Sequence, residues 1–260
     1  MTLPILIIDA FSDKIFGGNP AAVIITDNWL PDPLMLQVAM ENNQSETAFL
    51  VKENDHYYIR WFTPTTEVNL CGHATLAASH ALFHHHNHRG DTIQFQCKSG
   101  PLTVTRQNNE LTLNFPANPP ILTEAPENLY KALGISGGLV FTTSFDYMVL
   151  LGSQHDVEAL APDFNLLATV PARGVICTAT GDSTDFVSRC FYPQSGINED
   201  PVTGSAHTIM VPFWAAQLNK NSLDALQLSQ RKGYLRCSLN GNRVLMTGNA
   251  ITYLEGTIQI

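Results

Sequence analysis

The sequence carries one pattern twice, about half a chain apart. The first copy begins at Arg60 and the second at Arg189. Both read Arg-x-Phe-x-Pro and then turn through a glycine, Gly72 or Gly204, into a run with helical character. The offsets, 129 residues at the arginines and 132 at the glycines, are close to half of the 260-residue chain. A repeat held over several blocks indicates a duplication, so we expect two related halves and a pseudo-twofold axis.

Two more blocks return in the same order. Residues 93–102 repeat at an offset of 133, and residues 45–51 lie opposite residues 172–178 at an offset of 127, which sets Arg173 against Glu46. The strands and the Ala-rich run of each half predict a sheet or barrel curled around one central helix. The expected fold class is therefore α+β, with two pseudo-symmetric halves.

A proline-rich segment at residues 116–120 is the predicted crossing between the halves. The first barrel half is expected over residues 1–117, with the C-terminal strand 251–260 as a candidate addition. The second is expected over residues 118–250. Halves of about 130 residues are near the usual domain size.

Two local predictions concern short segments. Residues 227–228 are predicted to form a strand of the second half, by analogy with the aligned block of the first. The histidines among residues 84–88 are expected in a solvated loop. Metal binding is the alternative, but we find no carboxylate, cysteine or clean helical pair of histidines near them in the sequence.

Composition excludes several classes of function. The net charge is −9 and Lys and Arg are not clustered, which argues against a nucleic-acid partner. No apolar run approaches the roughly 20 residues of a membrane helix, and the N-terminus lacks signal-peptide features. The five cysteines are odd in number and widely spaced, without a CxxC pair, which disfavours disulfides and structural zinc. We expect a cytoplasmic homodimer with no membrane partner.

Polar residues near the repeated glycines are candidates for chemistry. Glu46 lies in a polar turn at the mouth of an apolar strand, where it is either a solvated turn residue or a partly desolvated base. His73 is the second residue of the first central helix, whose positive end favours a neutral ring, and it is either a hydrogen-bonding core residue or part of the chemistry. Asp200 precedes the second helix as a cap or a catalytic acid. Ser205 either caps that helix or donates to a substrate.

Cys71 stands directly before the first central helix, where a helix N-terminus lowers the pKa of a thiol. A catalytic thiol is therefore one interpretation. The second copy has no cysteine at the matching place, since it reads Thr203-Gly204-Ser205. Simple packing of the thiol is the other interpretation.

Three of these motifs resemble the signatures of the PhzF-like (phenazine-biosynthesis-like) isomerase family. They are Asn-Gln-Ser-Glu-Thr-Ala-Phe around Glu46, Cys71-Gly72-His73-Ala74-Thr75, and Asp200-Pro201-Val202-Thr203-Gly204-Ser205-Ala206. The opening Ile8-Asp9-Ala10-Phe11 with Gly18-Asn19-Pro20 and the block Phe95 to Val104 are also similar to the family. The resemblance implies a diaminopimelate-epimerase-like fold. Each half would be a β-barrel around a central helix, with the site in the cleft between the halves.

The resemblance also implies roles for individual residues. Glu46 would be the proton shuttle, with His73 and Asp200 beside the reacting atoms. Gly72, Gly204 and Ser205 would bind the substrate at the helix starts, and we add Asn19 and Cys71 to this binding set. Related racemases use two opposed cysteines, whereas only Cys71 falls at such a position here.

The sequence therefore predicts a cofactor-independent isomerase without a metal. It would move a proton on a small carboxylate-bearing metabolite by general acid/base catalysis through Glu46 in the interdomain cleft. Two alternatives from other classes stay open. One is a non-catalytic protein that binds small anions, and the other is a Cys71-dependent racemase or epimerase.

Overall fold

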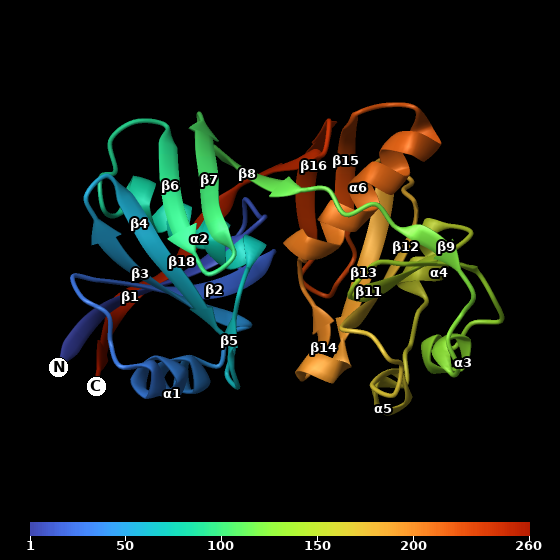
Figure 1. Cartoon of the computed structure of the whole chain (residues 1–260), viewed down its shortest axis with the longest axis horizontal. Coiled ribbons are helices and arrows are strands. Elements are labelled where there is room, and N and C mark those ends of the chain that lie inside the picture. Colours follow the sequence, from blue (N-terminus) through green and yellow to red (C-terminus); the bar gives the residue numbers. More distant parts are fainter. The chain divides into compact units, whose positions relative to one another are not determined.

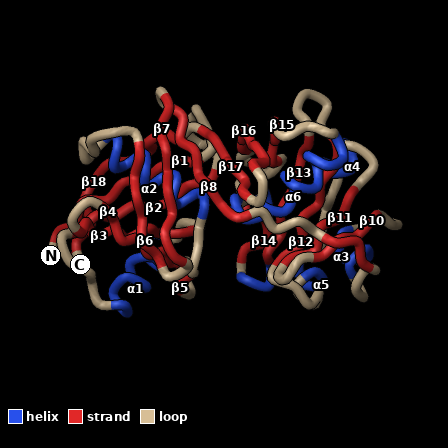
Figure 2. Tube along the Cα trace, turned by 45° about the horizontal axis from the view of Figure 1, so that its top comes forward, coloured by secondary structure: helices blue, strands red, loops and turns tan.

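The computed structural model describes all 260 residues, which form two compact units (Figure 1). Unit 1 comprises Met1–Phe115 and Leu245–Ile260, and unit 2 comprises Pro116–Val244. In each unit the strands curve around one long helix, as the distribution of helix and strand in Figure 2 also shows. The fold is α+β, as predicted.

Unit 1 holds two helices, α1 (Asp32–Asn42) and the central α2 (Gly72–His84). Its strands are β1 (Thr2–Ala10), β2 (Asn19–Thr26), β3 (Glu46–Glu53), β4 (His56–Phe62), β5 (Glu67–Val68), β6 (Thr92–Cys97), β7 (Gly100–Gln107), β8 (Glu110–Pro116) and β18 (Ala250–Gln259). A further strand, β17 (Arg243–Gly248), begins at the end of unit 2 and continues into unit 1.

Unit 2 holds the second central helix, α6 (Gly204–Leu218), and the short helices α3 (Leu129–Leu133), α4 (Gln154–Glu158), α5 (Phe164–Leu167) and the 3₁₀ turn η1 (Pro193–Ser195). Its strands are β9 (Ile121–Thr123), β10 (Leu139–Thr142), β11 (Asp146–Leu150), β12 (Gly174–Thr180), β13 (Phe186–Tyr192), β14 (Ile197–Asp200), β15 (Ser222–Gln227) and β16 (Gly233–Asn240). None of the helices in either unit combines the length and apolar character needed to cross a membrane.

The strand pairing of the two units is the same. In unit 1, β2 is parallel to β3, β3 is antiparallel to β4, β4 is parallel to β6, and β6 is antiparallel to β7. In unit 2, β11, β12, β13, β15 and β16 repeat this series of directions in the same order. The structure therefore confirms the duplication that the sequence predicted.

The two central helices are buried in different ways. Helix α2 is lined with alanines that are fully buried, which lets the strands of its unit approach closely. Helix α6 carries larger side chains. Trp214 stacks on Phe186 with ring centroids 5.9 Å apart, and its indole N–H donates to the hydroxyl of Thr178 over 3.0 Å. That hydrogen bond satisfies the one polar atom of a large buried ring.

The strand predicted at residues 227–228 is present, but its bounds differ, since it ends at Gln227 and begins five residues earlier than predicted. Strand β15 runs over Ser222–Gln227 and matches β6 at an offset of 130, not 133. The three additional residues lie in the turn that follows: residues 228–232 join β15 to β16, whereas residues 98–99 join β6 to β7. The offset measured at Gly100 and Gly233 therefore applies after the turn and not before it.

The histidine-rich segment is also more ordered than predicted. Helix α2 continues to His84, and the rings of His80 and His84 lie 4.3 Å apart. The Nε2 atoms of His80 and His85 lie 3.1 and 2.9 Å from the hydroxyl of Thr252 on β18. A carboxylate is also near, since Glu255 Oε2 lies 3.6 Å from His85 Nδ1. These histidines thus connect the end of α2 to the C-terminal strand.

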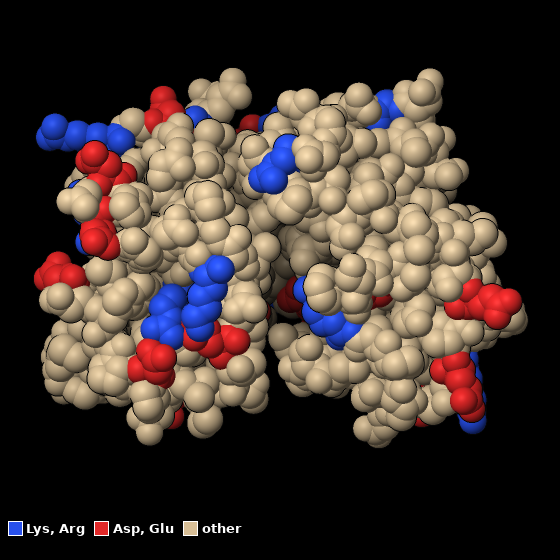
Figure 3. Space-filling view, in the orientation of Figure 1, with Lys and Arg blue, Asp and Glu red and all other residues tan.

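Charged side chains are sparse and mixed on the surface. On the face shown in Figure 3, Lys and Arg lie beside Asp and Glu and do not form one broad basic or acidic area. This distribution matches the low share of charged residues in the chain, 14%.

Candidate active site

The first group of predicted site residues surrounds the start of α2 in unit 1. The ring of His73 is buried, with 4% of its side chain exposed. Its Nε2 lies 3.1 Å from Glu46 Oε2. Its Nδ1 lies 3.1 Å from Asn19 Nδ2 and 3.6 Å from Cys71 Sγ. The imidazole therefore separates a carboxylate on one side from an amide and a thiol on the other.

Local chain direction explains why these residues meet. Asn19 is the first residue of β2 and Glu46 the first of β3, and these neighbouring strands are parallel, with Ala21 opposite Glu46. Two parallel strands begin at the same edge of a sheet. Cys71 is the N-cap of α2, with extended backbone angles, and His73 follows in its first turn. The start of the helix thus brings His73 to the edge where Asn19 and Glu46 lie.

The electrostatics of His73 differ from the prediction of a neutral ring. Burial disfavours its imidazolium, but the acidic groups of Cys71 and Glu46 outweigh burial and raise the pKa of His73 well above the usual 6.5. Burial also raises the pKa of the Cys71 thiol to about 11, and Glu46 adds to that effect. At neutral pH Cys71 is therefore a neutral thiol. The carboxylate of Glu46 is then the charge that favours the cation on His73.

The expectation that the helix N-terminus lowers the pKa of Cys71 is accordingly wrong. The thiol is buried and lies near a carboxylate, and both influences oppose a thiolate. A thiol is nucleophilic in its ionised form. The environment of Cys71 therefore does not activate it.

Three ligand-bearing side chains converge here, and we tested their fit to a metal ion. One potential ligand atom each from Glu46, Cys71 and His73 lies within 4.8 Å of the others. The thiol, however, faces Nδ1 of the ring and the carboxylate faces Nε2. A single ion bonds one ring nitrogen, so the three groups do not fit one metal unless the imidazole turns.

The second group of predicted residues lies in unit 2, before and at the start of α6. Asp200 ends β14 and is buried. Its Oδ2 accepts a hydrogen bond of 2.6 Å from the hydroxyl of Thr203. Gln227 completes the arrangement, because its amide N–H donates to the Asp200 carbonyl over 2.7 Å and its Oε1 accepts from the Thr203 backbone N–H over 2.8 Å. These bonds fix the loop that leads into α6.

The capping roles considered for Asp200 and Ser205 are not seen. The N-cap of α6 is Thr203, and no side chain accepts a capping hydrogen bond there. Ser205 Oγ instead accepts a hydrogen bond of 3.1 Å from Nη2 of Arg173. Arg173 in turn forms a two-bond ion pair with Asp146.

Sequence reasoning did not select Arg173 or Asp146 as site residues. A signal for Arg173 was present, because the sequence alignment sets it opposite Glu46; the strand pairing shifts this by one residue and sets Gly174 there. Asp146 had no comparable signal. The structure therefore yields one group in unit 1 (Asn19, Glu46, Cys71 and His73) and another in unit 2 (Asp146, Arg173, Asp200 and Ser205). The predicted proximity of Glu46 to Asp200 stays a prediction.

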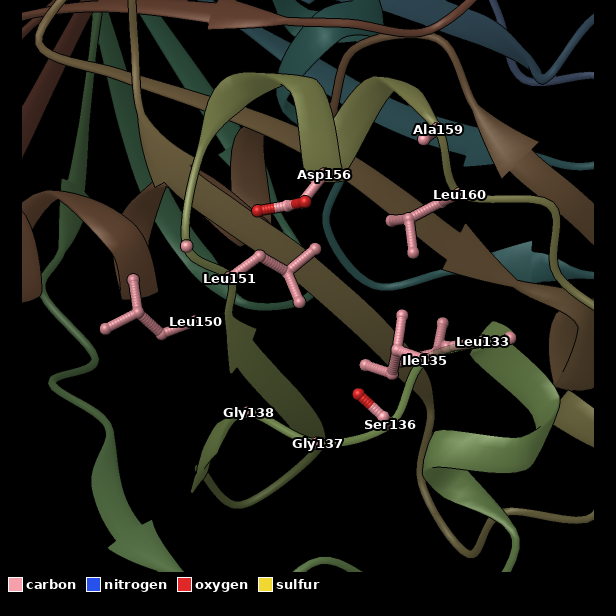
Figure 4. A pocket seen from close by; sticks show the side chains of 12 residues that line it. Leu133, Ile135, Ser136, Gly137, Gly138, Leu150, Leu151, Asp156, Ala159 and Leu160 are labelled. Carbon is pink, nitrogen blue, oxygen red and sulfur yellow. The ribbon is translucent and has the colours of Figure 1, made fainter.

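A separate pocket in unit 2 contains none of the predicted site residues (Figure 4). Its volume is about 440 Å³, and its lining comes mainly from glycines and aliphatic side chains of residues 133–138, 150–152, 159 and 160. Asp156 is the titratable residue of this lining, and its Oδ2 accepts a hydrogen bond of 2.8 Å from Ser153. With its carboxylate occupied in this way, the pocket offers little for acid/base chemistry.

Comparison with known proteins identifies the family. The phenazine biosynthesis-like protein family, PhzC-PhzF, matches residues 8–256. The chain is 46% identical over 260 residues to an uncharacterized isomerase of Pseudomonas aeruginosa, with both chains covered completely. A second uncharacterized isomerase of that organism is 49% identical over 253 residues, which cover 97% of each chain.

Solved structures agree with this assignment. A PhzF-family protein of Enterococcus faecalis superposes with a TM-score of 0.97 at 42% identity, and each chain is covered completely. A hydroxyproline epimerase from Agrobacterium vitis has a TM-score of 0.65 at 9% identity, over 99% of this chain and 92% of the other, and so shares the fold. The chain belongs to the phenazine biosynthesis-like (PhzC-PhzF) family, as an isomerase with the diaminopimelate-epimerase-like fold.

Proposed function

We propose that this isomerase moves a proton between two atoms of a small carboxylate-bearing molecule, with Glu46 as the general acid/base. The observation that carries the proposal is the pair formed by Glu46 and His73, whose Oε2 and Nε2 atoms lie 3.1 Å apart. Only 12% of the Glu46 side chain is exposed. A carboxylate that is sheltered from water and oriented by a partner is suited to proton transfer.

The pair divides the two carboxylate oxygens of Glu46 between two tasks. Oε2 faces the His73 ring, and Oε1 is left for a substrate. In the imidazolium that Glu46 favours, Nε2 carries a proton, and the positive ring lies against the carboxylate with Nε2 3.1 Å from Oε2. His73 then holds the carboxylate in place while Glu46 takes a proton from one carbon and returns it to another. The reaction conserves all atoms and needs no cofactor.

Unit 2 would contribute binding. We propose that Asp200, Gly204 and Ser205 act on the same substrate as the unit 1 group, and that the backbone N–H groups at the starts of α2 and α6 hold its anionic part. Free N–H groups and the positive end of a helix favour anions. The homodimeric state and the cytoplasmic location stay predictions of the sequence.

The proposal is tested by following hydrogen isotopes during turnover. Small carboxylates that the enzyme converts are identified by NMR, and the conversion is then repeated in D₂O. We expect deuterium at one carbon of the product. If Glu46 returns the proton before it exchanges, a substrate deuterated at the reacting carbon should show the label moved to a new position. A product with neither solvent deuterium nor a moved label would contradict proton transfer from carbon.

The alternative of a Cys71-dependent racemase has one observation in its favour, the 3.6 Å separation of Cys71 Sγ and His73 Nδ1. The raised pKa of Cys71 argues against it. We therefore expect Cys71→Ser to lower kcat by less than about 10-fold, because serine keeps the shape and polarity of the side chain. Steady-state kinetics measures the change. A loss of about 10³-fold or more would instead indicate a thiol mechanism.

A further inference from the structure

We propose that Arg173 is the carboxylate-binding residue of unit 2 and anchors the anionic group of the substrate. This inference rests on the proposed function, because it assigns a binding partner to the carboxylate that the reaction requires. Four observations support it: the way Arg173 is held, its remaining hydrogen-bond donors, its place in the repeat, and its neighbours.

The guanidinium of Arg173 is held in place by the buried side chain of Asp146. Its Nε donates to Asp146 Oδ1 over 2.9 Å, and its Nη2 donates to Asp146 Oδ2. The Asp146 side chain is 1% exposed, whereas that of Arg173 is 41% exposed. The backbone is held too, because the Arg173 N–H donates to the carbonyl of Phe145 over 2.7 Å. A two-bond pair of this kind sets the plane of the guanidinium.

The outer edge of the guanidinium keeps donors for a ligand. Nη2 reaches Ser205 Oγ over 3.1 Å, but Nη1 has no hydrogen-bond partner in the protein. Two other arginines are held in two-bond pairs and use Nη1 internally. Nη1 of Arg189 donates to the Leu160 carbonyl over 2.7 Å, and Nη1 of Arg60 donates to an aspartate over 2.8 Å. In Arg189 and Arg60 the Nη1 atom is thus used within the protein, whereas in Arg173 it is available to a ligand.

The repeat gives Arg173 the same relation to α6 that Glu46 has to α2. In unit 1 the second residue of the central helix, His73, lies against Glu46. In unit 2 the second residue, Ser205, lies against Arg173. The strand pairing refines the sequence alignment, because Gly174 is the first residue of β12, as Glu46 is of β3, and Arg173 precedes it by one. The start of the matching strand thus carries an acid at its first residue in unit 1 and a cation one residue earlier in unit 2.

The neighbours of Arg173 favour binding by hydrogen bonds over binding by net charge. Asp146 neutralises the guanidinium, so attraction of an anion depends on the free Nη1 donors, on Ser205 and on the positive end of α6. Tyr192 supports the guanidinium, whose central carbon lies 5.4 Å from the ring centroid. The lack of a side chain at Gly174 lets the Tyr192 ring pack beside it, since a Cβ atom there would lie 2.1 Å from that ring.

Benzoate serves as the probe, with benzamide as its uncharged counterpart. In ¹⁵N-labelled protein we expect benzoate to move the Arg173 Nε resonance in a saturable manner, and benzamide to have a far weaker effect. Calorimetry should show that Arg173→Gln weakens benzoate binding by at least about 10-fold, because charge-assisted hydrogen bonds are lost. Arg173→Lys should bind with intermediate affinity, since lysine keeps the charge but not the two-pronged geometry.

Lys131→Gln, which removes one positive charge from the exposed surface of α3 in the same unit, is the matched control and should leave the affinity unchanged. Unchanged benzoate affinity in R173Q or R173K would overturn the inference, and so would the absence of a saturable shift in the wild-type protein. Glu46→Gln separates this inference from the proposed function. That variant should bind benzoate about as the wild type does while losing turnover, so retained turnover would count against the function and not against Arg173.

Discussion

Replacing Glu46 by glutamine should lower kcat by about 10³-fold or more and leave ligand affinity largely intact. The amide has nearly the shape of the carboxylate, and its oxygen can still lie against Nε2 of His73, which is 3.1 Å from Glu46 Oε2. An amide cannot take up a proton from carbon at neutral pH. Removal of a general base typically costs 10²- to 10⁴-fold. Steady-state kinetics on a converted carboxylate, together with calorimetry, measures the two effects separately.

Glu53 provides the matched control for this substitution. It is the last residue of β3, as Glu46 is the first, and it is exposed. Glu53→Gln removes the same charge from the same strand and should leave kcat unchanged. If Glu46→Gln retained more than about a tenth of the wild-type kcat, Glu46 would not be the proton carrier, and a protein that only binds small anions would become the better interpretation.

The duplication was the most informative part of the sequence, because strand order and direction followed from it. The duplication misplaced residues near the turn between β15 and β16, because this turn has three more residues than its counterpart and the alignment shifts by three there. Turn length has little effect on the energetics of a hairpin, so apolar patterns on both sides stay intact while the offset changes. The pairing between strands, which cannot be read from the sequence, was needed to place residue 227 correctly.

The sequence located the acid and the histidine of unit 1 but not their electrostatics. A helix N-terminus disfavours a cation by only about 0.3 to 1 kcal/mol. A nearby opposite charge is a stronger influence at a partly buried site, and the approach of Glu46 to His73 depends on two strands and a helix meeting at one edge. The pair of Asp146 and Arg173 was missed for a related reason, since the two residues are 27 positions apart and only the parallel pairing of β11 and β12 joins them.

His207 should make the enzyme lose stability on mild acidification. The side chain lies on α6 and is fully buried. Its Nδ1 lies 2.8 Å from the Thr203 carbonyl, which requires the proton on Nδ1, and its Nε2 has no hydrogen-bond partner. Burial lowers the pKa of His207 to about 4, although the bond to Thr203 opposes that change. A second proton would have to be placed on Nε2 without a partner.

The direction of the effect follows from proton binding. Between pH 6.5 and about 4 the unfolded chain binds a proton at His207 and the folded chain does not. The free energy of unfolding therefore rises with pH across this window, and the contribution of the neutral His207 is lost as the pH falls. The difference between the two pKa values corresponds to a loss of about 3 kcal/mol in the free energy of unfolding, at about 1.4 kcal/mol for each pH unit.

His207→Gln cannot titrate and can still donate to the Thr203 carbonyl, so its stability should fall less between these pH values. Urea unfolding from pH 7 to pH 4 measures both curves, with His155→Gln, at an exposed position on α4, as the control. Parallel curves for the wild type and the His207 variant would show that this histidine does not set the acid limit.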